Sequence, residues 1–236
     1  YHAQDFEFLR PKVSLRYKIR FPKERITPRF KVLVDTYTRC VNESLNELAY
    51  PANLAGLNYS FAAGYEGVYF SINGFDESAA QLFENFLDHM QNIKITETTF
   101  EALKDGYVRS LKNFPKENAW RITQTRFYAA LNAVDYSPEE RLPILEGITL
   151  EDIQTFAQAL YQKGAIEALV HGNFTADQAV ALTRIMQTTL GIQALPKVAT
   201  FEQTHLQQPE PESLHQVEQL EVNNSCFWRN YLLGPA

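Results

Sequence analysis

Apolar and polar residues alternate strictly near the beginning of the chain. From Val13 to Phe21 every second side chain is apolar, and the side chains between them are serine, arginine or lysine. A period of two predicts a β-strand with one buried face and one solvated face. The solvated positions include Arg16, Lys18 and Arg20. We therefore expect a half-buried strand whose exposed side is basic.

The period then changes to three and four residues. Thr27 and Pro28 supply a helix N-cap and a first-turn proline, and a stripe of apolar residues follows them. This spacing predicts a long amphipathic helix, and Pro51 predicts a kink or break in it before Ala52. The stripe consists of Phe30, Leu33, Val34, Tyr37, Val41, Leu45 and Leu48.

Two extended runs follow the turn at Gly56. The runs 59–62 and 67–73 are joined by four residues that include Gly64, which predicts a β-hairpin beside the helix. A helix that leads directly into a hairpin is the smallest unit that can begin an α+β core. The fold class expected from the residues is therefore α+β.

Helical spacing and capping residues recur through the middle of the chain. Together with one short apolar run they give the order β-α-β-β-α-α-α-α-β-α. We expect the inward face of the first strand to be buried with Leu45, Leu48, Phe83 and Phe86. The remaining predicted elements are helices at 76–90, 96–114, 115–134 and 149–160, a short helix or turn at 142–145, a strand at 165–171 and a helix at 175–190.

The pattern divides the chain into three parts. Residues 1–191 are expected to form one domain. Periodicity disappears over 192–216, where the run QQPEPES predicts an extended linker. Beyond it the apolar segments 217–222 and 226–233 predict strands, so residues 217–236 would be the first strands of a further, incomplete repeat. Exposed strands associate with other edges, and we expect this segment to dock on the first domain or pair with a second copy.

Composition narrows the possible functions. The 236 residues carry a formal net charge of −6 at pH 7, which gives no electrostatic basis for binding nucleic acid or an anionic membrane. No apolar run approaches the roughly 20 residues of a transmembrane helix. Cys40 and Cys226 are too few for a disulfide framework or a zinc knuckle. Because the chain begins with Tyr1 rather than Met, we expect it to be a piece of a longer protein.

No pattern of residues predicts a catalytic or metal site. The sequence contains no phosphate-binding glycine loop and no serine, cysteine or lysine nucleophile motif, although a triad assembled in space would leave no such signature. His89 has no second His or Cys nearby. His171 ends a predicted buried strand and is interpreted as a hydrogen-bonded structural histidine. We therefore assign no catalytic residue and no metal ligand to this chain.

Several separated sequences resemble the insulinase (pitrilysin) family of insulin-degrading-enzyme-like zinc metallopeptidases. SLNELAYPANLAGLNYS and GVYFSINGF are similar to a helix and hairpin of the family's middle, non-catalytic domain. FEALKDGYVRSLKNF, LEDIQTFAQAL and IEALVHGNFT are similar to its later helices and last strand, in the same order. The matching positions, interpreted as structural, are Asn46, Glu47, Ala49, Tyr50, Leu54, Ala55, Gly56, Leu57, Tyr59, Gly67, Tyr69, Ser71, Gly74, His171, Gly172 and Asn173.

The resemblance implies an antiparallel sheet with helices packed on one side, the repeating unit of this family. It also implies the middle domain of a bacterial zinc metalloendopeptidase, in which two halves enclose a peptide. The partners would then be peptide substrates and the zinc-bearing N-terminal half of the parent chain, with no cofactor in this fragment. The resemblance favours the periplasm, with the cytoplasm as the alternative compartment.

The family's zinc motif, H-x-x-E-H on a helix, is absent here. The nearest sequence, at 215–219, has Gln219 in place of the second histidine and lies where a linker meets a predicted strand. We expect no peptidase activity from this chain alone. The alternative hypothesis is an inactive scaffold or binding subunit related to the core proteins of processing peptidases. An upstream H-x-x-E-H helix in the parent chain would decide for the protease.

Overall fold

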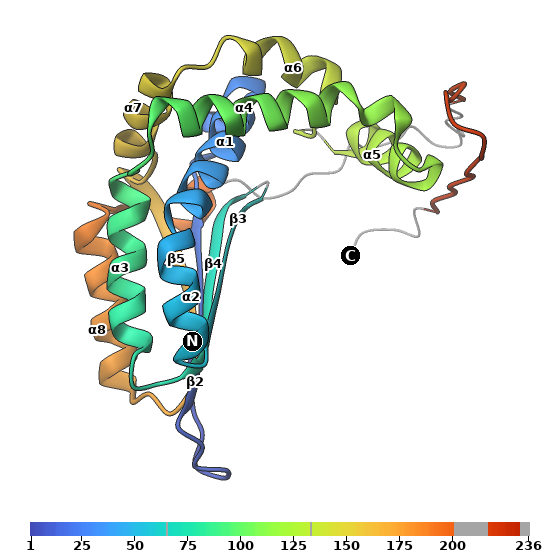
Figure 1. The fold of residues 1–236 in the computed structure, drawn as a ribbon. Coiled ribbons are helices and arrows are strands. Elements are labelled where there is room, and N and C mark those ends of the chain that lie inside the picture. Colours follow the sequence, from blue (N-terminus) through green and yellow to red (C-terminus); the bar gives the residue numbers. More distant parts are fainter. Residues whose placement is uncertain (65, 133, 201–216, 232–236) are drawn as a thin grey trace.

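The computed structural model describes residues 1–64, 66–132, 134–200 and 217–231. Its centre is one sheet in the order β1-β5-β2-β4-β3, with β6 beside β5 (Figure 1). β2, β3, β4 and β5 pair antiparallel, whereas β1 and β6 are each parallel to β5. The strands are β1 (His2–Gln4), β2 (Lys12–Arg20), β3 (Leu57–Ala63), β4 (Gly67–Phe75), β5 (Lys163–Gly172) and β6 (Gln193–Ala194).

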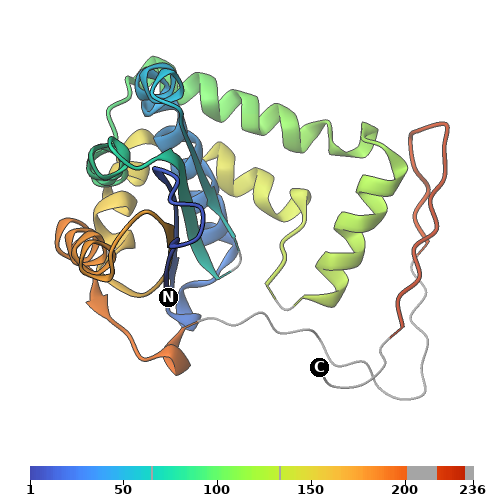
Figure 2. The same ribbon diagram turned by 90° about the horizontal axis from the view of Figure 1, so that it is seen from below.

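Helices cover one face of this sheet. α1, α2, α3, α7 and α8 form that layer, whereas α4, α5 and α6 form an arm that reaches away from it (Figures 1 and 2). The helices are α1 (Pro28–Ser44), α2 (Asn46–Leu54), α3 (Ala79–Gln91), α4 (Glu97–Lys112), α5 (Ala119–Leu131), α6 (Pro138–Glu146), α7 (Leu150–Leu160) and α8 (Ala176–Thr189). This arrangement confirms the predicted α+β class and the one-sided helical layer.

The alternation in β2 explains why only one face is covered. Val13, Leu15, Tyr17 and Ile19 are buried against the helices, whereas the alternate positions point to the other face. Aromatic rings fill the space between sheet and helices, and Phe70 stacks on Phe86 of α3 with ring centres 5.0 Å apart. Such stacked pairs add to the free energy gained by burying apolar area.

The break in the first long helix lies earlier than predicted. α1 ends at Ser44 and α2 begins at Asn46, so the interruption falls at Leu45, while Pro51 lies inside α2. Proline removes one backbone donor, the partner that the Glu47 carbonyl would otherwise have. Glu47 is exposed, so water can bind that carbonyl and the helix continues.

Two short strands were not predicted from the sequence. β1 and β6 have three and two residues, which is too few to show a period. The first part of the predicted linker at 192–216 is not extended and solvated. It contains β6, and Ile192 and Thr200 are buried against the domain. The described part of that segment is therefore packed on the sheet, and residues 201–216 lie outside the described residues.

The two strands predicted near the C-terminus are wrong for the part of the chain that can be described there. Residues 217–231 form neither helix nor strand, and 232–233 lie outside the described residues. A strand is stable only within a ladder, and no strand of the sheet pairs with this segment. Val217 and Phe227 are 95% and 83% exposed, whereas Trp228 is 39% exposed because it lies against α5.

The predicted core is largely confirmed. Leu45, Phe83 and Phe86 are fully buried, but Leu48 is only partly buried at the edge of the core. Leu48 lies in α2, beyond the break, and therefore does not continue the buried stripe of α1 as a single straight helix would.

Replacing Leu45 tests this assignment. Leu45→Ala should lower the free energy of unfolding by about 2–5 kcal/mol, since it leaves a cavity in a close-packed core. The matched control Leu54→Ala alters a side chain that is 72% exposed and should change stability by less than about 0.5 kcal/mol. Denaturant unfolding measures both values. Equal losses in the two variants would show that the buried face is assigned wrongly.

The two cysteines should differ in reactivity. Cys40 is fully buried in α1, and desolvation raises the pKa of its thiol to about 12, whereas Cys226 is partly exposed. Because the thiolate is the reactive form, iodoacetamide should modify Cys226 in the native protein and Cys40 only after denaturation. Peptide mapping by mass spectrometry distinguishes the two sites. Rapid native modification of Cys40 would contradict the packing of α1.

Candidate functional site

One face of the sheet carries no helical layer, and the arm reaches out past that side (Figure 2). Polar side chains from neighbouring strands form rows across this surface, which we call the open face. Arg16 is paired in register with Ser71 on one side and Leu169 on the other. The central residues of the open face are Arg16, Lys18, Ser60, Tyr69, Ser71, Glu167 and Leu169.

Four charged residues form an ion-pair network at one end of the open face. The Arg20 guanidinium lies 3.1 Å from carboxylate oxygens of both Glu66 and Glu167, and the Lys18 ammonium also pairs with Glu66. The Arg20 side chain is only 8% exposed, so its charge requires these partners. Burial alone would raise the pKa of Glu66, but Lys18 and Arg20 outweigh this effect and lower it. The two positive and two negative charges compensate one another.

Arg16 lies beside this network in different surroundings. It is exposed, and no acidic group among the described residues lies within ion-pair distance of it. A cavity of about 400 Å³ surrounds it, lined also by Ser60, Ser71, Tyr69 and Leu169. The cavity therefore offers the Arg16 guanidinium and the hydroxyl groups of two serines and a tyrosine to a ligand, together with an apolar side, and Lys18 and Glu167 of the ion-pair network also line it.

A second cavity of about 400 Å³ lies where the arm meets β3, and Ala62 lines both cavities. In its wall Asp35 accepts a hydrogen bond of 3.0 Å from the Tyr107 hydroxyl and lies 3.8 Å from Arg141. Burial and the charge of Asp35 raise the pKa of Tyr107. The Arg39 guanidinium lies over the Tyr107 ring, 4.3 Å from its centre, and has no acidic partner among the described residues.

The adjoining cavities are positively charged on an acidic protein. Five basic and three acidic side chains line them, although the chain as a whole carries a net charge of −6. Such local excess charge attracts ligands of opposite sign. The basic residues are Arg16, Lys18, Arg39, Arg121 and Arg141, and the acidic residues are Asp35, Glu117 and Glu167.

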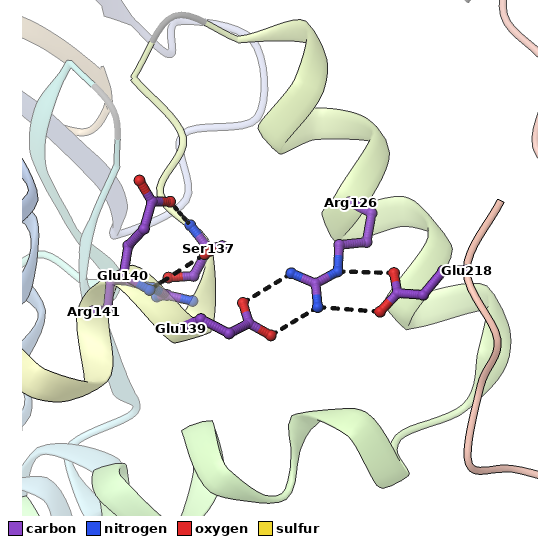
Figure 3. A network of polar contacts seen from close by, with 6 residues as sticks. All are labelled: Arg126, Ser137, Glu139, Glu140, Arg141 and Glu218. Atoms are coloured by element: carbon purple, nitrogen blue, oxygen red, sulfur yellow. Dashed lines mark hydrogen bonds and ion pairs between the residues drawn. The ribbon is translucent and has the colours of Figure 1, made fainter. Parts of the chain in front are cut away.

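The C-terminal segment is held against α5 by a shared arginine. Arg126 donates two hydrogen bonds of 2.7 and 2.8 Å to Glu139 and two of 3.0 and 3.2 Å to Glu218 (Figure 3). Trp228 stacks on Phe127 of the same helix, with ring centres 5.6 Å apart. These contacts agree with the predicted docking of the segment, although it docks without forming strands.

The family-motif residues do not converge on one site. Tyr50 and Leu54 are exposed on α2, whereas Leu57 is buried and the Tyr59 hydroxyl donates to the Leu45 carbonyl at 3.2 Å. Tyr69 and Ser71 lie on the open face, and Asn173 donates to Asp76 at 2.6 Å. The exposed residues of the α2 motif are Asn46, Glu47, Tyr50, Leu54 and Ala55, with Ala49 partly buried.

Glycines in the motif have steric roles. Gly74 has φ +142°, and a side chain there would collide with the backbone of Gly56. Gly67 lies so close to the Ile19 carbonyl of β2 that a Cβ would overlap it. Gly172 also has a positive φ and approaches the Lys12 carbonyl. Only glycine allows these strands to approach so closely.

The histidines do not form a reactive centre in the described structure. His171 is exposed, and its imidazole has no hydrogen bond to a described residue, so its interpretation as a hydrogen-bonded structural histidine is wrong. It lies one residue before the end of β5, on the solvated side of the strand. The His89 imidazole contacts the Ser44 hydroxyl at 3.1 Å. No group of three or more His, Cys, Asp or Glu side chains could hold a metal ion within the described ranges, and His215 lies outside them.

The basic side of β2 could be predicted from the sequence, but which of its charges are balanced could not. The sequence places Arg16, Lys18 and Arg20 on one face, yet only the sheet register shows that two of them are neutralised by Glu66 and Glu167. No pattern in the sequence predicts that Arg39 lines the second cavity, between the arm and β3, which we call the arm cavity.

The described helices include none that is long and apolar enough to cross a bilayer. The fold is the α+β unit found in metallopeptidases of the pitrilysin type. Residues 1–143 match the family described as the middle or third domain of peptidase M16. The chain therefore belongs to this family, as the motifs in the sequence predicted.

Individual relatives agree with this assignment. The chain is 30% identical over 187 residues to insulin-degrading enzyme of Homo sapiens, covering 79% of this chain and 18% of that protein. Insulin-degrading enzyme of Drosophila melanogaster is 31% identical over 192 residues, covering 80% and 19%. The chain thus spans about a fifth of the length of these relatives.

Solved structures show the same relationship. The crystal structure of pitrilysin has a TM-score of 0.72 at 28% identity, covering 81% of this chain and 20% of that chain. A peptidase M16 inactive domain from Pseudomonas fluorescens has a TM-score of 0.59 at 14% identity, covering 84% and 49%, which is a likeness of fold.

The contact between α6 and α5 should be sensitive to acid. Hydrogen bonds from Arg126 lower the pKa of Glu139 to about 2 from an ordinary value of 4.5. A lowered pKa means that the stabilisation is complete above the ordinary value and is lost as pH falls from 4.5 towards 2. Because Glu139 is 55% exposed, Glu139→Gln should cost only about 0.2–1 kcal/mol at pH 7.

The same substitution should weaken the dependence of unfolding free energy on pH in that window. Urea unfolding followed by circular dichroism at several pH values measures it. Glu151→Gln, which alters an exposed carboxylate on α7 with no ion-pair partner among the described residues, is the matched control. An acid response in Glu139→Gln identical to that of the unaltered protein would contradict the assignment.

Proposed function

We propose that this chain is the non-catalytic middle domain of a bacterial pitrilysin-like zinc metalloendopeptidase. In this role it forms part of the wall of a peptide-enclosing chamber, opposite the half that carries zinc. The observation that supports the proposal is the open face, which lacks a helical layer and adjoins the arm cavity. The wall limits the space for the peptide and positions it. Zinc and the activated water are supplied by the other half of the parent.

The polar composition of the open face supports a surface that is exposed to a solvated compartment. A sheet face that packed permanently on another domain would be apolar, as the helix-covered face is. Here serines, a tyrosine and charged residues occupy the corresponding positions. Backbone and side-chain groups of this kind can contact a peptide without requiring one sequence.

The alternative is an inactive scaffold or binding subunit. The similarity in fold to a peptidase M16 inactive domain from Pseudomonas fluorescens is the observation in its favour. The two functions differ in the parent chain, since only the protease requires an H-x-x-E-H helix in its N-terminal part. Determining the complete reading frame distinguishes them.

Photo-crosslinking tests the proposed surface. A neutral peptide carrying a benzophenone group should remain intact when mixed with the 236-residue chain, and light should attach it to residues of the open face such as Ser60, Tyr69 and Ser71. Peptide mapping by mass spectrometry locates the labels. An unlabelled peptide in excess should compete. Labels confined to the outer faces of α3 and α8, or uncompeted labelling, would contradict the proposal.

A further inference from the structure

Arg16 is the charged residue of the open face whose charge is not balanced within the described structure. Its neighbours Lys18 and Arg20 share the carboxylates of Glu66 and Glu167. No described acid lies within ion-pair distance of Arg16, although the residue lies in the middle of the central strand. The structure therefore places an unpaired guanidinium at the centre of a polar surface.

The cavity around Arg16 has the chemistry of an anion site. Ser71 lies directly opposite Arg16 in the register of β4, and Ser60 lies opposite Ser71 in β3. Both hydroxyl groups line the same cavity of about 400 Å³ as the arginine. A guanidinium presents its N–H groups in a plane that matches the two oxygens of a carboxylate, and the serine hydroxyls can donate to the same oxygens.

The apolar side of this cavity restricts the kind of ligand. Leu169 lies opposite Arg16 in β5, and Ala62, Tyr69 and Ala168 also line this side, whereas Lys18 and Glu167 line the cavity from the ion-pair network. Such a cavity suits a carboxylate attached to an apolar or neutral chain better than a small inorganic anion, which would gain nothing from the apolar surface. The five basic and three acidic residues of the two cavities add an attractive field for negative charge.

We infer that Arg16 anchors a carboxylate group of the bound peptide, either an acidic side chain or the C-terminal carboxylate. This inference rests on the proposed function, because it assumes that the open face contacts peptide. Arg16 would then be a specificity-determining residue that favours acidic peptides. It takes no part in bond cleavage.

Binding of matched peptides tests the inference. The probes are dansyl-labelled Ala-Ala-Leu-Glu-Ala-Ala with an amidated C-terminus, the same peptide with Gln in place of Glu, and the Gln peptide with a free carboxylate. Fluorescence anisotropy with the 236-residue chain at low salt should show that at least one carboxylate peptide binds about threefold to tenfold more tightly than the neutral peptide. Comparing the two carboxylate peptides identifies which source of the group is preferred.

Arg16→Gln should remove this preference, so that the carboxylate peptides bind no more tightly than the neutral peptide. Arg16→Lys keeps the charge but not the planar fork and should retain part of the preference. The matched control is Arg184→Gln, an exposed arginine of α8, which should behave as the unaltered chain. Circular dichroism verifies that each variant is folded, as expected for an exposed position.

The possible failures are distinct. If all peptides bind equally and Arg16→Gln has no effect, the carboxylate site is wrong while the peptide-contacting surface stands. If Arg184→Gln reduces the preference as much as Arg16→Gln, the effect is general electrostatics and the site is likewise wrong. If no peptide binds, both the inference and the proposed function are overturned.

Discussion

The pairing of β2 with two antiparallel neighbours is the constraint on which the rest of the structure depends. β4 and β5 pair with it along nearly its whole length. Because paired residues point to the same face of a sheet, the alternation of buried and exposed side chains in β2 fixes which side chains of β4 and β5 are buried. Leu15 and Ile19 direct one side of all three strands towards the helices. Arg16 and Lys18 direct the other side to solvent. A shift of register by one residue would exchange the two faces and bury four charged side chains.

The same alternation explains how much could be predicted from the sequence. A period of two in β2 and a period near 3.6 in α1 are strong signals because each repeats over several residues. β1 and β6 gave no signal, since their positions are set by pairing with β5 rather than by their own residues. The C-terminal segment shows the converse error, because apolar residues with β propensity form a strand only where an edge is available.

The candidate surface was harder to predict than the fold for a physical reason. A charged residue on a strand has the same appearance in the sequence whether or not its charge is balanced. Arg20 and Arg16 are four positions apart on one face of β2, yet one is nearly buried between two carboxylates and the other is exposed without an acidic partner in the described structure. Arg20 differs from Arg16 because Glu66 and Glu167 lie next to it. These two carboxylates are far from β2 in the sequence and approach it only because β4 and β5 pair with β2.

The distribution of ion-pair partners also decides which charged side chains of the open face are available to a ligand. Charges that are needed to stabilise the sheet, such as Arg20, are compensated internally, so a ligand cannot recruit them without breaking a buried ion pair. Arg16 contributes to no ion pair in the described structure, so contacting a ligand costs no existing interaction. Its backbone is held by hydrogen bonds to two neighbouring strands, which limits the entropy lost on binding. If the proposed function holds, this rigid sheet with an arginine outside the ion-pair network would orient a bound peptide, and bond cleavage would fall to the other half of the parent.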